Sequence, residues 1–67
     1  MKREELKIDQ IIKFGNDTFK VTKTDVNNPA DYDQGFNAQR MIKSRNEWTQ
    51  QSHFLKFDNL GRMEIIK

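Results

Sequence analysis

Few side chains in this chain of 67 residues could carry out catalysis. His53 is the single histidine and the only good base near neutral pH, and Ser52 directly precedes it. Neighbouring residues of a strand point to opposite faces of the sheet, so Ser52 and His53 would not form a nucleophile–base pair. We therefore expect His53 to be a surface or edge residue, no residue to be catalytic, and the protein not to be an enzyme.

Ligands for a metal ion or a phosphate-bearing cofactor are equally sparse. The chain has no cysteine, and Asp31 and Asp33 share a face in an extended segment without completing an EF-hand pattern. Gly15 and Gly61 stand alone, without the spacing of a phosphate-binding loop, and are typical of turns. We expect neither a metal site nor a cofactor.

Basic and aromatic side chains are interleaved in the second half of the chain. Six Lys and Arg face three acids from Gln34 onward, a net charge of +3, whereas six face seven acids in the first 33 residues, a net charge of −1. Basic groups neutralise phosphates, and an exposed aromatic ring stacks on an unpaired base with about 1–3 kcal/mol. A DNA- or RNA-binding face is therefore one hypothesis, formed by Arg40, Lys43, Arg45, Trp48, His53 and Lys56.

Two observations weigh against this hypothesis. The whole chain carries a net charge of only +2, far from the basic excess of a dedicated non-specific nucleic-acid-binding protein. A small domain with one tryptophan is also expected to use Trp48 in its core, with the lysines on solvated strand faces.

A protein partner is the competing interpretation. Asp31, Tyr32 and Asp33 would suit a basic partner surface through charge complementarity, although Asn and Asp are equally typical of a solvated loop. A strand from Trp48 to Ser52 would offer its edge to a partner's strand, and edge pairing between two copies would give a homodimer. We expect an accessory or regulatory module that binds a protein partner, with nucleic-acid binding as the alternative.

Size and composition limit the architecture and the cellular context. A chain of this length forms one domain, 1–67, with a thin core, since it buries only about 60% of the surface that its unfolded state exposes. The absence of cysteine suits a reducing compartment, and the longest apolar runs fall far short of the ~20 residues of a membrane span. We expect a cytoplasmic protein without membrane contact. The abundance of Lys, Asn, Asp and Ile suggests an AT-rich genome, such as that of a low-GC bacterium or one of its phages or mobile elements.

A β-hairpin is predicted near the start of the chain. The β-prone residues 11–14 and 18–24 flank Gly15, Asn16 and Asp17, which are typical turn residues. Phe19 and Val21 alternate with polar residues, as in a strand with one buried face. The preceding segment, from Lys2 to Lys7, is expected to add one frayed helical turn.

A second hairpin is predicted near the end of the chain. The β-prone residues 54–57 and 63–66 flank residues 58–62. Asp58 and Gly61 occupy positions that suit a type I turn followed by a left-handed residue.

The middle of the chain permits two interpretations. Pro29 follows a potential N-cap and could open a helix toward Ser44. Against the helix, Phe36 and Met41 fall on nearly opposite sides of a helical wheel, and an interior Gly35 costs about 1 kcal/mol. As a strand, Phe36, Ala38, Arg40 and Ile42 share one face, and we prefer the strand.

Together these elements predict a mainly β domain of about five short strands. We expect either an SH3-like or OB-like small barrel or a strongly bent antiparallel sheet, to which one short helix could be added. The expected core consists of Ile8, Ile11, Phe14, Phe19, Val21, Phe36, Ile42, Trp48, Phe54, Phe57 and Ile65. Ile12, Met41, Leu55, Met63 and Ile66 are not assigned to either environment.

Overall fold

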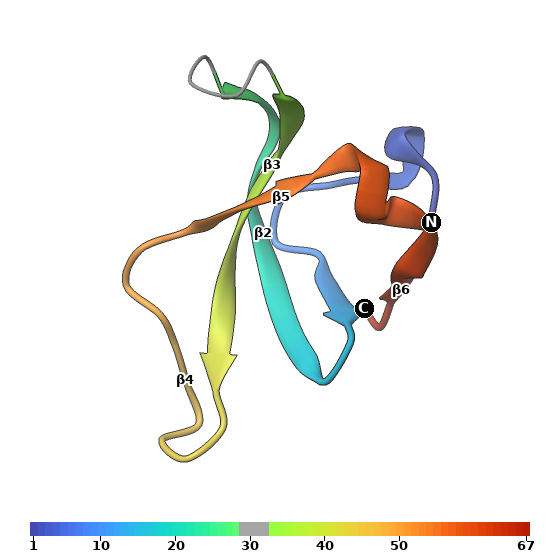
Figure 1. Ribbon diagram of the computed structural model, residues 1–67. Coiled ribbons are helices and arrows are strands. Elements are labelled where there is room, and N and C mark those ends of the chain that lie inside the picture. Colours follow the sequence, from blue (N-terminus) through green and yellow to red (C-terminus); the bar gives the residue numbers. More distant parts are fainter. Residues whose placement is uncertain (29–32) are drawn as a thin grey trace.

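The computed structural model describes residues 1–28 and 33–67, which form one antiparallel sheet with two short 3-10 helices (Figure 1). The sheet has the strand order β4-β3-β2-β1-β6, and β5 also pairs with β3. The elements in chain order are η1 (Arg3–Glu5), β1 (Ile11–Phe14), β2 (Asp17–Asn28), β3 (Asp33–Ile42), β4 (Glu47–Trp48), β5 (His53–Lys56), η2 (Phe57–Arg62) and β6 (Met63–Ile65).

The first predicted hairpin is confirmed. β1 and β2 pair in the register Ile12↔Phe19 and Phe14↔Asp17. Gly15 takes up a φ of 63°, which glycine adopts without the steric cost that a Cβ atom would bring. The helical turn that was predicted before this hairpin is present as η1.

The predicted strand in the middle of the chain is confirmed over Asp33–Ile42. β3 forms the most extensive pairing of the sheet with β2, in which Ala38 lies opposite Val21 and Arg40 opposite Phe19. The β2–β3 register shifts between Val21 and Lys23 and again beyond Lys23. Such irregularities bend and twist a strand, which accounts for the curved hairpin of β2 and β3 in Figure 1.

The strand predicted from Trp48 to Ser52 is wrong beyond Trp48. β4 ends there, and the chain bends at Gln50 and Gln51 before β5 begins. Thr49 holds this bend, since its amide donates to the Arg40 carbonyl at 2.8 Å and its hydroxyl donates to the Gln51 carbonyl at 2.9 Å. β4 and β5 therefore pair with two separate parts of the same β3 edge.

The second predicted hairpin is also wrong. β5 pairs with β3 and β6 with β1, so these neighbours in sequence do not pair with each other. The 3-10 helix η2 replaces the expected turn, and Gly61 is not in a left-handed conformation. This helix buries Leu60, which a tight surface turn would leave exposed.

The core lies between one face of the sheet and the segments that contain η1 and η2. Phe36, Ile12 and Val21 have no exposed surface, and each contributes about 1.5–3 kcal/mol by burial. The Phe57 ring lies 6.3 Å from that of Phe36 and extends the core toward η2. The buried set is Leu6, Ile12, Phe19, Val21, Phe36, Ala38, Leu60 and Met63.

The predicted core was correct in its centre and wrong at its margins. Ile8 and Ile65 were expected inside, but they are 59% and 41% exposed. Ile65 belongs to the edge strand β6, which pairs with β1 alone among the described strands. Two further predicted core residues, Phe14 and Phe57, are half-buried and pack against the core. The remaining four are half-buried outside it: Ile11, Ile42, Trp48 and Phe54.

The expected mainly β architecture is confirmed. The domain has six strands instead of about five, and over the described residues their sheet is not closed. It therefore corresponds to the bent antiparallel sheet and not to a closed barrel. Within the same residues, no helix has the length and apolar character needed to cross a membrane.

Candidate functional site

The alternation of β3 gives the sheet two chemically different faces. Phe36 and Ala38 are fully buried and point into the core. Asn37, Gln39 and Met41 have the opposite parity and therefore point away from it. Neighbouring strands place their register partners on the same side, so the pairings identify the other members of this second face.

Three neighbouring rows of paired residues form the central part of the second face. Lys23, Asn37 and Phe54 form a row across β2, β3 and β5. The strands β1, β2 and β3 contribute a row of Ile11, Lys20 and Gln39, and Met41 pairs with Trp48 of β4. We call this surface the outer face, and it consists of Ile11, Lys20, Lys23, Asn37, Gln39, Met41, Trp48 and Phe54.

Trp48 lies on the outer face and is not part of the core. Its side chain is half-buried, and the ammonium group of Lys20 lies 5.6 Å from the centroid of its ring. This distance is within the range of a cation–π contact. The expectation that the single tryptophan fills the core is therefore wrong.

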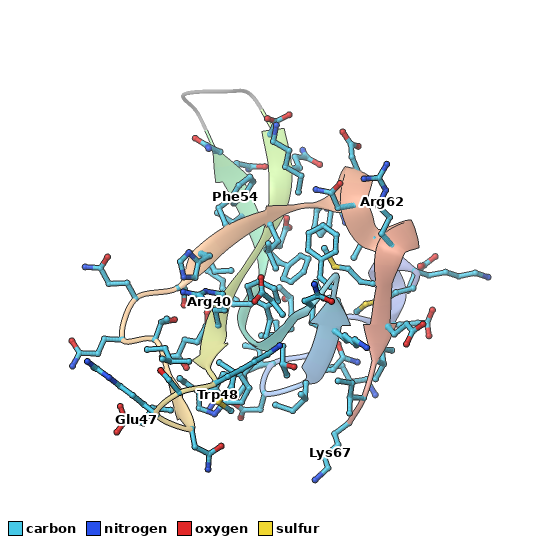
Figure 2. All side chains as sticks on the ribbon, turned by 60° about the horizontal axis from the view of Figure 1, so that its bottom comes forward. Arg40, Glu47, Trp48, Phe54, Arg62 and Lys67 are labelled. Atoms are coloured by element: carbon cyan, nitrogen blue, oxygen red, sulfur yellow. The ribbon has the colours of Figure 1, made fainter. Side chains whose placement is uncertain are left out.

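Phe54 is the second aromatic residue of the outer face. It pairs with Asn37 in register, and its ring leans over the backbone of Gly35, where no side chain competes for the space. Phe54 and Trp48 thus occupy the same edge of β3 at two positions, one on β5 and one on β4. Figure 2 shows both residues on the left of the molecule and Arg62 at its upper right.

Polar groups on the outer face are suited to contact a ligand. Lys20 and Lys23 are the charged residues of its three rows. A further row on the same side of the sheet, across β1 and β6, adds one basic residue and the acid Glu64. Within the described residues, the side-chain amides of Asn37 and Gln39 make no hydrogen bond, although both residues are half-buried. The face therefore combines two aromatic rings, two cations and two available amides.

The basic residues predicted from the second half of the chain do not form one patch. Arg40 lies on the core side of β3, opposite Phe19, so it projects from the other face than Trp48 does. Lys43 donates a hydrogen bond to the carbonyl oxygen of Asn16 and ties two turns together. Arg45 is exposed in the turn between β3 and β4.

The other predicted site residues lie on different sides of β5: His53 is on the core side, and Lys56 is on the side of Phe54, two residues along the strand. His53 is exposed at the start of β5, opposite Ala38. Lys56 forms an ion pair of 3.0 Å with Asp33, which engages one of the three residues proposed to bind a protein partner. The other two, Asp31 and Tyr32, lie outside the described residues, so that proposal stays a prediction.

Of the eight residues of the outer face, Trp48 alone was predicted from the sequence as a site residue. Lys20 and Lys23 belong to the acidic first half of the chain, yet β2 lies directly beside β3, which places Lys20 against Trp48 and Lys23 in the row of Phe54. The alternation of polar and apolar residues in β2 signals that Lys20 faces away from the core. Its neighbour on β3 follows only from the register.

Comparisons with known proteins add no assignment, because no protein-family model, curated protein or solved structure matches the chain. The function is therefore inferred from the geometry of the outer face.

Proposed function

We propose that this protein is a non-enzymatic binding module and that its outer face binds single-stranded nucleic acid. One observation carries the proposal. Lys20 lies above the ring of Trp48, on a sheet surface that also presents Phe54 and two amides without a partner in the described structure. Aromatic rings that stack on bases, beside cations that neutralise phosphates, are the two components of single-strand recognition.

An unpaired strand suits this surface better than a duplex does. A ring lying on a sheet can stack only on a base whose face is exposed, and bases within a duplex already stack on each other. The modest charge agrees with this preference, because stacking contributes about 1–3 kcal/mol per base without any added cation. Two lysines on the face predict a shallow dependence of affinity on salt.

The fluorescence of Trp48 provides a direct test, because it is the only tryptophan. We expect thymidine octanucleotide, as DNA and as RNA, to quench this fluorescence at about 50 mM salt and to bind more weakly at about 200 mM. The double variant Lys20→Gln/Lys23→Gln should bind more weakly and lower the salt slope by about 0.7 per lost phosphate contact.

Arg62→Gln is the matched control, because it removes one cation from η2, which contributes no residue to the outer face. It should leave both affinity and salt slope unchanged. If neither oligonucleotide changes the fluorescence at the lower salt concentration, the proposal is wrong and the face is a surface for a protein partner. Equal losses in the double variant and in Arg62→Gln would also contradict it.

Self-association through β6 is a second candidate function, favoured by the apolar residues at that edge. Ile65 and Ile66 are 41% and 50% exposed. The amide of Ile66 donates to the Ile11 carbonyl at 2.8 Å, so the alternation of an antiparallel ladder directs the backbone groups of Ile65 away from β1. If the β6 strands of two copies pair antiparallel around Ile65, the two Ile65 side chains lie opposite each other. A pairing around Glu64 would instead place two carboxylates opposite each other.

Light scattering over a range of protein concentrations tests this candidate. We expect a weak dimer, because β6 has only three residues, and we expect Ile65→Lys to abolish it. Ile8→Lys is the control, since it places the same charge on another exposed isoleucine outside the strands. A protein that stays monomeric at millimolar concentration would exclude the dimer.

A further inference from the structure

Each of the two aromatic residues of the outer face has a lysine of β2 on the same face, across β3. Phe54 shares a row with Lys23, and Trp48 lies under the ammonium group of Lys20. Lys20 contacts the ring of Trp48, whereas Asn37 of β3 lies between Lys23 and Phe54.

The strand β3 sets the distance between Phe54 and Trp48 along the sheet. Phe54 lies opposite Asn37 and Trp48 opposite Met41, four residues further along the strand. At about 3.4 Å per residue these positions are separated by about 14 Å. Gln39 lies between them, on the same face.

We infer that the outer face holds two base subsites for one single strand, which runs along β3 from Phe54 to Trp48. This inference rests on the proposed binding of single-stranded nucleic acid. In each subsite a base stacks on the ring and the lysine neutralises a neighbouring phosphate. The amides of Asn37 and Gln39 donate to and accept from base edges between the subsites, because an amide presents both functions.

The separation between the positions of Phe54 and Trp48 along β3 is too large for two adjacent stacked nucleotides to fill both subsites. Stacked bases along one strand rise by about 3.4 Å, a quarter of the separation between the two positions. A dinucleotide therefore occupies one ring at a time, while a longer strand reaches both. Once a base of the strand is bound at one ring, binding of another base at the second ring is intramolecular. The affinity therefore rises with strand length by more than the increase in the number of possible binding positions.

A length series separates this inference from the proposed function. Thymidine dinucleotide and octanucleotide are titrated separately against the wild type and against Phe54→Leu, with Trp48 fluorescence as the readout. Leucine keeps an apolar side chain near Gly35 but removes the ring that stacks. Urea unfolding of each variant verifies that it is folded.

An octanucleotide offers about seven positions for a contact of dinucleotide size, which alone raises its affinity about sevenfold above that of the dinucleotide. In the wild type we expect the octanucleotide to exceed this statistical factor by at least tenfold. In Phe54→Leu that excess should disappear, while the affinity of the dinucleotide at Trp48 changes less than threefold. Met63→Leu, which alters a buried residue on the core side, is the control and should retain the excess.

Each possible failure has a distinct signature. If the wild type binds the octanucleotide only by the statistical factor more tightly, Trp48 is a lone subsite and the inference is wrong, although the proposed function stands. An excess that survives in Phe54→Leu would likewise remove Phe54 from the site. If neither length changes the fluorescence, the proposed function itself fails.

Discussion

The ring of Phe54 lies against the backbone of Gly35, with its Cζ atom 2.8 Å from the position that a Cβ atom on Gly35 would occupy. The carbonyl oxygen of Leu55 lies closer still to that position. The close approach of β5 to β3 therefore requires a residue without a side chain at position 35.

Gly35→Ala should consequently destabilise the domain. The added methyl group collides with backbone as well as with a ring, so β5 must move, and we expect a loss of about 2–3 kcal/mol in the free energy of unfolding. Gly61→Ala is the matched control, because no atom lies within 4 Å of its added Cβ atom, and its effect should stay within about 0.5 kcal/mol. Urea unfolding compares the two variants. Equal stabilities would show that β5 does not pack on Gly35.

Phe36→Ala should cost about 3–5 kcal/mol, because this side chain is fully buried and its removal leaves a cavity. A domain of this size has a total stability of about 3–10 kcal/mol, so the variant should lose a large part of it. Ile65→Ala tests the opposite expectation, since 41% of Ile65 is exposed. Urea unfolding distinguishes them, and a Phe36→Ala protein nearly as stable as the wild type would contradict the core assignment.

Lys43 joins the turn between β3 and β4 to the turn between β1 and β2 through its bond to the Asn16 carbonyl. Lys43→Met removes the donor but keeps the length of the side chain, and we expect a loss of about 0.5–1 kcal/mol. Arg45→Met should change the stability less, because Arg45 is exposed and its side chain has no partner in the described structure. Thermal unfolding measures both, and a larger loss for Arg45→Met would contradict the role of Lys43.

Arg40→Gln should leave oligonucleotide affinity and its salt slope unchanged. Arg40 projects from the core side of β3, whereas the proposed ligand lies on the outer face. Lys20→Gln removes the same charge from the neighbouring strand and should weaken binding. Trp48 fluorescence titrations of both variants test this difference, and a stronger effect of Arg40→Gln would restore the basic patch expected from the sequence.

Local patterns were sufficient to predict the elements whose partners are close in sequence. Gly15 and its polar neighbours encode a turn, and the alternation around Phe19 identifies the buried face of β2. The alternation around Phe36 similarly indicates a strand. These signals are local, because a turn and a pleat depend only on the residues that form them.

Elements with distant partners could not be predicted in the same way. The residues of β5 and β6 resemble the arms of a hairpin, yet η2 directs the chain inward at Leu60 and delivers β6 to β1. No pattern within residues 53–66 indicates that β1 has an edge to which β6 could pair.

The residues of the candidate site could not be predicted from the sequence for a related reason. Charge was counted by halves of the chain, but the sheet places β2 of the first half directly beside β3 of the second. Lys20 therefore meets Trp48, while Arg40, only one residue beyond Gln39, points to the other side. The register decides which residues share a surface, and the register of β2 with β3 shifts twice.

The pairing of β1 with β6 has a consequence for how fast the domain folds. It brings Ile12 beside Ile65, near opposite ends of the sequence, and the entropy of closing that long loop must be overcome before the contact stabilises anything. Because such distant pairings slow folding, we expect the domain to fold within milliseconds to seconds, as all-β domains do, and not within microseconds as small helical bundles do. A chain that has formed its central hairpin but not this last pairing would expose the edge of β1, together with part of the core that Met63 covers in the native state.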